Sequence, residues 1–156
     1  MRNFCMVAAL LVLPAVLLDA CGGGMSEEDR VKVVIGDVVK AAGDKDLDGV
    51  KRHISKRYRD PAGNDYEALK GIVLFYFMQP EGISLFTRRQ RVEVKGDKAI
   101  VTLNAVISRG QKVKSIKDLV PAESGGFVFD LTFEREGGKW LLTSATWRQV
   151  GMAEAL

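Results

Sequence analysis

Between residues 26 and 82, apolar side chains recur every three or four positions, which is the spacing of amphipathic helices. The apolar face of the first predicted helix consists of Val31, Val34, Ile35, Val38 and Ala42. Ser26 precedes this helix and is suited to be its N-cap, because its hydroxyl can accept from a free amide of the first turn. Gly43 is expected at the C′ position, where the helix ends.

Two further helices are expected before residue 83. The inner face of the second, short helix is expected to hold Leu47, Val50 and Ile54. Either Asp44 or Asp46 is suited to cap it. The third helix is expected to begin at Asn64, since Glu67 follows three residues later as in a capping box, and to end at Pro80.

Beyond residue 83 the period changes from helical to alternating, which indicates strands. One hairpin is expected to join 85–94 to 99–108 through a turn centred on Gly96-Asp97, and a second to join 127–135 to 140–149 through Gly137-Gly138. Helices followed by antiparallel strands predict an α+β domain in which three N-terminal helices pack on one face of the sheet.

Strict alternation assigns the side chains of each hairpin to two faces. In the second hairpin the inner face is expected to hold Phe127, Phe129, Leu131, Phe133, Trp140, Leu142, Ser144, Thr146 and Arg148. Trp147 is then an exception on an otherwise polar outer face. In the first hairpin, the same count puts Arg88 and Gln90 on an otherwise apolar inner face.

An apolar inner face with a few polar groups is typical of a ligand cavity, in which the polar groups orient the ligand. The candidate ligand-binding residues are Arg88, Gln90, Tyr76, Phe129, Trp140 and Arg148. In the alternative interpretation, Arg88 reaches the edge of the sheet and pairs with a carboxylate such as Asp60 or Glu81.

The chain resembles the nuclear transport factor 2-like, or SnoaL-like, superfamily, in which a curved sheet wraps three helices into a cone. Residues 41–50, AAGDKDLDGV, are similar to the superfamily's Gly-Asp-x-Asp junction between the first two helices. Tyr58-Arg59-Asp60 before the third helix, and Trp140 and Trp147 on the last strand, add to the resemblance. It implies a cone-shaped α+β fold with a curved antiparallel sheet.

Several enzymes of this superfamily use buried Asp and His side chains as acid and base, and its ketosteroid isomerases pair an Asp base with a Tyr and a protonated carboxylic acid. Tyr58, Asp60 and Tyr76 match no position of that motif. His53, the single histidine, lies in the basic run 51–57, which indicates a solvated helix face. We therefore expect no catalytic residue, no metal site and no cofactor.

The N-terminal residues form a secretory signal, because Arg2 precedes an apolar run over 6–18 that is too short to span a bilayer. Leu18-Asp19-Ala20-Cys21 resembles the bacterial lipobox, which implies that Cys21 is lipidated. The expected organisation is a signal peptide over 1–20, the lipidated Cys and a Gly-rich tether over 21–25, the folded domain over 26–150, and a C-terminal tail over 151–156.

Composition limits the function. With 47% hydrophobic residues the chain can bury a core, and a net charge of +3 is far from the bias of nucleic-acid binders. Together these features predict a non-catalytic lipoprotein on the periplasmic side of the bacterial envelope, at the outer membrane, that binds a small apolar ligand. The alternatives are a module that binds another envelope protein or a second copy and, ranked third, an isomerase- or lyase-type enzyme.

Overall fold

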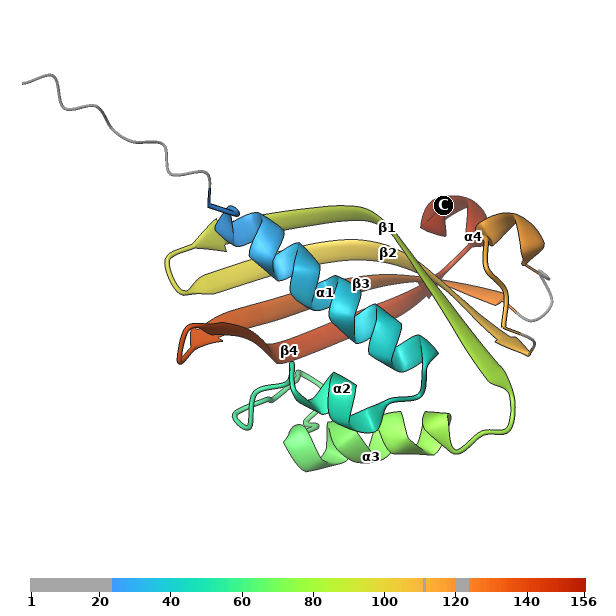
Figure 1. Cartoon of the computed structure of the whole chain (residues 1–156), viewed down its shortest axis with the longest axis horizontal. Coiled ribbons are helices and arrows are strands. Elements are labelled where there is room, and N and C mark those ends of the chain that lie inside the picture. The colour runs from blue at the N-terminus through green and yellow to red at the C-terminus, as the bar shows by residue number, and fades with distance from the viewer. Residues whose placement is uncertain (1–23, 111, 120–123) are drawn as a thin grey trace, which may run out of the picture.

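In a computed structural model that describes residues 24–110, 112–119 and 124–156, three helices precede a four-stranded antiparallel sheet of order β1-β2-β3-β4 (Figure 1). The helices are α1 (Glu27–Gly43), α2 (Leu47–Lys51), α3 (Tyr66–Phe77) and α4 (Met152–Ala155), with a 3-10 turn η1 (Ile116–Asp118). The strands are β1 (Gly82–Lys95), β2 (Lys98–Gly110), β3 (Ser124–Glu136) and β4 (Lys139–Val150). The predicted α+β class and order of elements are confirmed.

Two parts of the expected organisation need separate comment. The expected signal peptide and the lipidation site Cys21 lie outside the described residues. Residues 151–156, expected as a tail, include α4, whose Ala155 is fully buried. Within the described part of the chain, no helix combines the length and the apolar character needed to cross a membrane.

Side-chain caps define where the helices begin. Ser26 accepts a hydrogen bond from the Asp29 N–H at 3.1 Å, as predicted. Of the two candidate caps for α2, Asp46 accepts from the N–H of Gly49 at 2.9 Å. The predicted start of α3 is wrong by one residue, because its N-cap is Asp65 and not Asn64.

The junction between α1 and α2 depends on a glycine. A Cβ atom on Gly49 would lie 2.4 Å from the Oδ2 atom of Asp46 and 2.8 Å from the Cβ atom of Ala41. Only a residue without a side chain allows the cap of α2 and the last turn of α1 to approach this closely.

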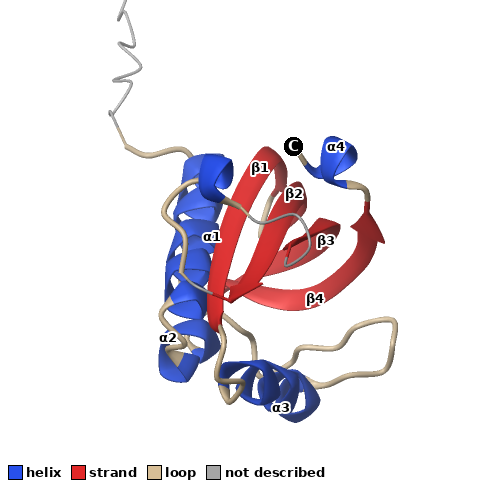
Figure 2. Cartoon of the chain, turned by 90° about the vertical axis from the view of Figure 1, so that its right-hand side faces the viewer, coloured by secondary structure: helices blue, strands red, loops and turns tan. Residues whose placement is uncertain are grey.

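The core lies between α1 and the inner face of the sheet, which we define as the face that α1 covers. Its buried residues are Val31, Ile35, Ala99, Val101, Leu103, Ala105, Phe133 and Trp140. The short α4 lies on the opposite side of the sheet (Figure 2). There Gly126 leaves room for Ala155, whose Cβ would be 2.7 Å from a Cβ on Gly126.

Two β-bulges break the alternation. Between the pairs Arg88–Asn104 and Arg91–Thr102, β1 advances three residues while β2 advances two. The bulge includes Arg89, whose φ of 45° lies in the left-handed region. In β4 the extra residue is Thr143, because Thr132 of β3 pairs with Ser144 whereas the next residue, Phe133, pairs with Leu142. Because one extra residue moves every later side chain to the other face, the expected face assignment is wrong beyond each bulge.

Candidate functional site

The inner face is covered at one end of the sheet and partly exposed at the other. At the hairpin end, where the two tight turns lie, Phe133 and Trp140 are buried beneath α1. At the opposite end, where β2 and β4 finish, Phe127 and Phe129 are only partly buried and Trp147 is 47% exposed. We call this second end the open end.

Phe127, Phe129 and Trp147 form a continuous row on the inner face, which we call the aromatic surface. The ring centroids of Phe127 and Phe129 are 6.2 Å apart, and those of Phe129 and Trp147 are 6.5 Å apart. Large aromatic side chains are mostly buried in proteins, so a partly exposed aromatic row on the face that elsewhere forms the core is a candidate binding surface.

Backbone geometry builds this surface. Beyond the β4 bulge, Trp147 lies opposite Phe129, and residues directly opposite each other share a face. Trp147 is therefore on the inner face, and its expected exceptional place on the outer face is wrong. The edge of the Phe127 ring lies against Gly125. A Cβ atom on Gly125 would be 2.9 Å from the Cε2 atom of Phe127.

The bulges also remove the two expected arginines from this surface. Arg88 lies opposite Asn104, on the outer face, and is exposed. Arg148 lies opposite Val128 on the same outer face and pairs with Glu154 at 2.9 Å. The expectation that both arginines point into the cone is wrong.

Gln90 lies within the β1 bulge and donates to the Oγ1 atom of Thr87 at 2.9 Å, so its polar group is used locally. The alternative ion pair of Arg88 with Asp60 or Glu81 is absent from the described residues.

Trp140, another of the expected site residues, lies in the core beneath α1. It is buried near the hairpin end, and its Nε1–H donates to the Oε2 atom of Glu27 at 2.8 Å, which joins β4 to the start of α1. Phe129 and Tyr76 do lie toward the open end. The Tyr76 ring, on α3, is 5.4 Å from the guanidinium carbon of Arg109 at the end of β2.

Arg109 is a residue that the sequence analysis did not single out. It follows Ala105 and Ile107 in the alternation along β2, which places it at the inner-face register. That uninterrupted alternation is the signal that identifies it. Its side chain is exposed and takes part in none of the ion pairs among the described residues.

Tyr58 and Asp60 form a buried Tyr–carboxylate pair, with their oxygens 3.1 Å apart. Burial, with the adjacent carboxylate, strongly raises the pKa of Tyr58. Burial by itself raises the pKa of Asp60, but hydrogen bonds from Asn64, Tyr58 and the Ala62 N–H outweigh it, so that pKa is lowered. Both shifts move the pKa of the group further from 7, whereas an acid–base catalyst needs a pKa near the pH at which it works.

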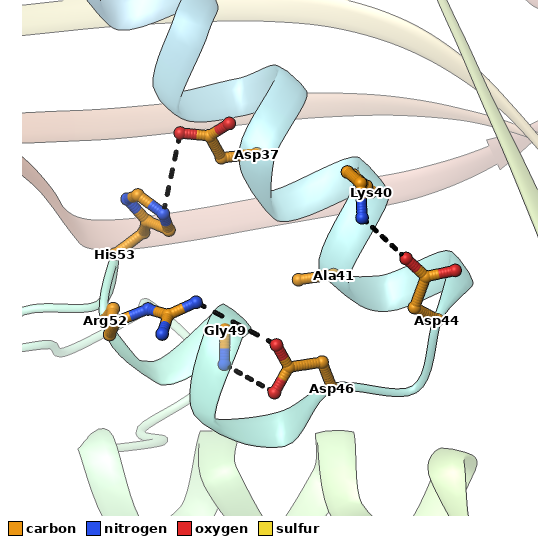
Figure 3. Close-up of a pocket in the computed structure, with 8 residues that line it drawn as sticks. All are labelled: Asp37, Lys40, Ala41, Asp44, Asp46, Gly49, Arg52 and His53. Carbon is orange, nitrogen blue, oxygen red and sulfur yellow. Dashed lines mark hydrogen bonds and ion pairs between the residues drawn. The ribbon is translucent and has the colours of Figure 1, made fainter.

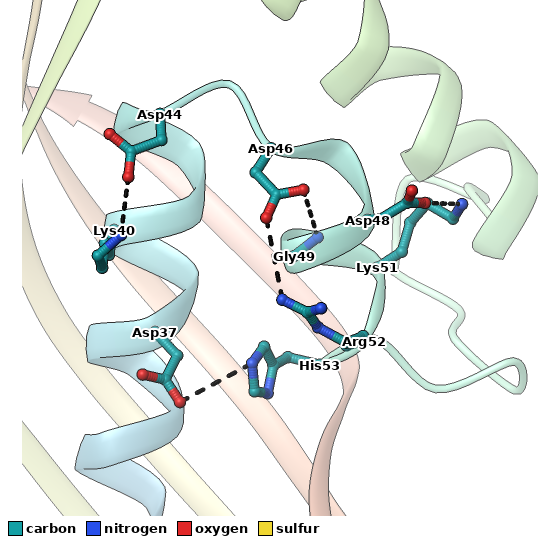
Figure 4. A network of polar contacts seen from close by, with 9 residues as sticks. All are labelled: Asp37, Lys40, Asp44, Asp46, Asp48, Gly49, Lys51, Arg52 and His53. Carbon is teal, nitrogen blue, oxygen red and sulfur yellow. Dashed lines mark hydrogen bonds and ion pairs between the residues drawn. The ribbon is translucent and has the colours of Figure 1, made fainter.

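A second, polar cleft of about 430 Å³ lies between α1 and α2 (Figure 3). It is lined by Asp37, Lys40, Ala41, Asp44, Asp46, Gly49, Arg52 and His53. Its charges pair with one another, Lys40 with Asp44 at 2.9 Å and Arg52 with Asp46 at 3.9 Å (Figure 4). Since these groups already satisfy each other, the cleft has little free charge for a ligand.

His53 belongs to this cleft and is mostly covered, so its expected place on a solvated face is wrong. Its Nε2 atom is 4.0 Å from the Oδ2 atom of Asp37. Burial lowers the pKa of His53 against the opposing effect of Asp37. Among the residues that the structure describes, no cluster of three or more His, Cys, Asp and Glu side chains is arranged to hold a metal.

Comparison of the sequence with protein-family models and with curated proteins finds no match. Comparison of the structure shows that the chain has the nuclear transport factor 2-like, or cystatin-like, fold. It is similar to a putative dehydratase of that family from Streptomyces avermitilis, with TM-score 0.66 and 18% identity over 80% of this chain and 96% of the other. A nuclear transport factor 2-like protein of unknown function from Pseudomonas putida has TM-score 0.65 and 17% identity over 85% and 95%. Bd1075 from Bdellovibrio bacteriovorus has TM-score 0.66 and 10% identity, over 80% of this chain but 41% of its own length.

Proposed function

We propose that this domain is a non-catalytic ligand-binding module of a bacterial envelope lipoprotein, anchored through Cys21, and that a small apolar ligand binds the aromatic surface. The observation that carries the proposal is the exposure of Trp147, which is 47% although it lies on the face that forms the core elsewhere. Covering 100 Å² of such a surface stabilises a complex by about 2.5 kcal/mol.

The placement of α3 supports this function. The helix packs through Leu69, Val73 and Phe77, while Phe75 is 62% exposed. Phe75 is therefore largely open to solvent.

A dehydratase is the second candidate, since the Streptomyces avermitilis neighbour and one from Novosphingobium aromaticivorans are titled putative dehydratases. The Tyr58–Asp60 pair is the observation in its favour. However, both Asp60 carboxylate oxygens already accept hydrogen bonds, Oδ1 from the Asn64 N–H and Oδ2 from Tyr58 and the Asn64 side chain. A carboxylate held in this way stabilises the loop before α3, and we rank the enzyme below the binding module.

Native mass spectrometry of the chain purified from bacterial envelopes tests the proposal. We expect an additional mass that dissociates on denaturation and that Trp147→Ala removes. Ile100→Ala is the matched control, because Ile100 is 49% exposed but lies opposite Thr132 on the outer face. A bound mass that survives Trp147→Ala, or a wild-type chain that carries none, contradicts the proposal.

A further inference from the structure

We infer that the ligand is a long-chain carboxylate, with its carboxylate at Arg109 and its hydrocarbon chain along the aromatic surface. This inference rests on the proposed function and adds the chemical class of the ligand. Two features of the open end support it: a cation that has no ion-pair partner among the described residues, and a distance that matches an extended chain.

The cation is the guanidinium of Arg109, which belongs to none of the ion pairs in the described part of the chain. It lies over the Tyr76 ring, with its carbon 5.4 Å from the ring centroid. A guanidinium that stacks on a ring keeps its N–H groups, which point outward from its edge, available to a planar acceptor such as a carboxylate. Tyr76 therefore orients Arg109 without neutralising it.

The distance from this cation to the far end of the aromatic row, at Phe129 and Trp147, matches a long ligand. Phe129 lies opposite Leu103, six residues before Arg109 along β2. Six residues of an antiparallel strand span about 20 Å, which is the length scale of an extended acyl chain. A short aromatic acid cannot contact both Arg109 and Trp147 at once, whereas a long-chain carboxylate can.

Photo-crosslinking with two matched probes tests the inference in envelope membranes that contain the full chain. The probes are a diazirine derivative of palmitic acid and the same derivative of hexadecanol, which lacks the carboxylate. We expect the acid to label the β3 and β4 peptides that carry Phe129 and Trp147. Arg109→Gln should reduce this labelling about tenfold, since it removes a charge-assisted hydrogen bond. Arg88→Gln, on the outer face, should leave it unchanged.

The outcomes separate this inference from the proposed function. If both probes label the wild type equally and Arg109→Gln has no effect, the carboxylate assignment is wrong, while loss of labelling in Trp147→Ala still supports an apolar ligand. If a lysophospholipid displaces the acid more effectively than unlabelled palmitate does, the ligand is a phospholipid, and the inference is also wrong. If neither probe labels these peptides, the inference fails, and native mass spectrometry then decides the proposed function by itself.

Discussion

Phe129 on β3 and Trp147 on β4 lie directly opposite each other on the inner face of the sheet, with ring centroids 6.5 Å apart. Simple alternation along β4 puts Trp147 on the outer face. The extra residue at Thr143 reverses that assignment, and in doing so it converts an exposed surface tryptophan into part of a candidate binding surface. The position of one bulge therefore decides on which face of the sheet Trp147 lies.

The two tryptophans provide a direct test of this register. In a Trp140→Phe variant the remaining Trp147 should be quenched readily by iodide, because its side chain is half exposed, whereas in Trp147→Phe the buried Trp140 should be protected severalfold. Bound palmitate should protect Trp147 and leave Trp140 unaffected. Equal quenching of the two single-tryptophan variants would contradict the described burial.

Trp140 should contribute to stability and not to ligand binding. Trp140→Phe removes the hydrogen bond to Glu27 while it keeps most of the ring volume, so we expect a loss of about 1 kcal/mol in the free energy of unfolding. Urea denaturation measures this loss, and native mass spectrometry should show unchanged ligand occupancy. If Trp140→Phe loses the ligand but not stability, Trp140 belongs to the binding site.

Two glycines should respond to alanine in opposite directions. Gly49→Ala places a Cβ atom 2.8 Å from that of Ala41 and closer still to Asp46, so we expect a loss of about 2 kcal/mol or more. Gly71→Ala, in α3, meets nothing within 4 Å and should stabilise the fold by up to about 1 kcal/mol. Denaturation midpoints compare the two, and equal effects would mean that the α1–α2 junction is loosely packed.

Stability should rise with pH in two steps. A hydrogen bond from Ser55, and the hydrogen bond and charge of Arg57, lower the pKa of Glu136 against the effect of burial. The stability that Glu136 provides is therefore present above its unfolded pKa of about 4.3 and is lost as the pH falls further. The pKa of His53 is lowered by burial, so the unfolded chain binds the proton more tightly and stability falls as the pH drops below about 6.5.

Melting temperatures between pH 3 and pH 8 measure both steps. His53→Asn should flatten the upper step and leave the lower one in place. Glu136→Gln should reduce the lower step, to which the lowered pKa values of Asp44 and Asp60 also contribute, and should leave the upper step in place. An unchanged upper step in His53→Asn would assign that step to another group.

Membrane attachment tests the expected organisation of the N-terminus. Cys21→Ala should move the protein from the membrane fraction to the soluble fraction after cell fractionation, because the expected acyl chains attach through this side chain. Cys5→Ala, within the expected signal peptide, is the control and should leave the protein in the membrane fraction. Firm membrane binding of Cys21→Ala, with an unmodified mass, would contradict lipidation.

The sequence by itself determined the features that depend on short-range interactions. Ser26 caps α1 because its hydroxyl reaches an amide three residues away, and the hairpin turns form at Gly96 and Gly137, whose φ angles are positive. The order of elements followed from the change of hydrophobic period. The sequence did not distinguish the two candidate caps of α2, Asp44 and Asp46, and it placed the cap of α3 one residue too early, at Asn64.

Tertiary structure alone decided the candidate site. A bulge arises where the twist and bend of a strand must fit the helices and strands packed around it, and no local pattern in β1 or β4 marks its position. One extra residue in each strand moved Arg88 and Arg148 to the outer face and Trp147 to the inner face. Arg109 and Tyr76 come together because the end of β2 meets α3 across more than 30 residues of sequence, a proximity that sequence spacing does not encode.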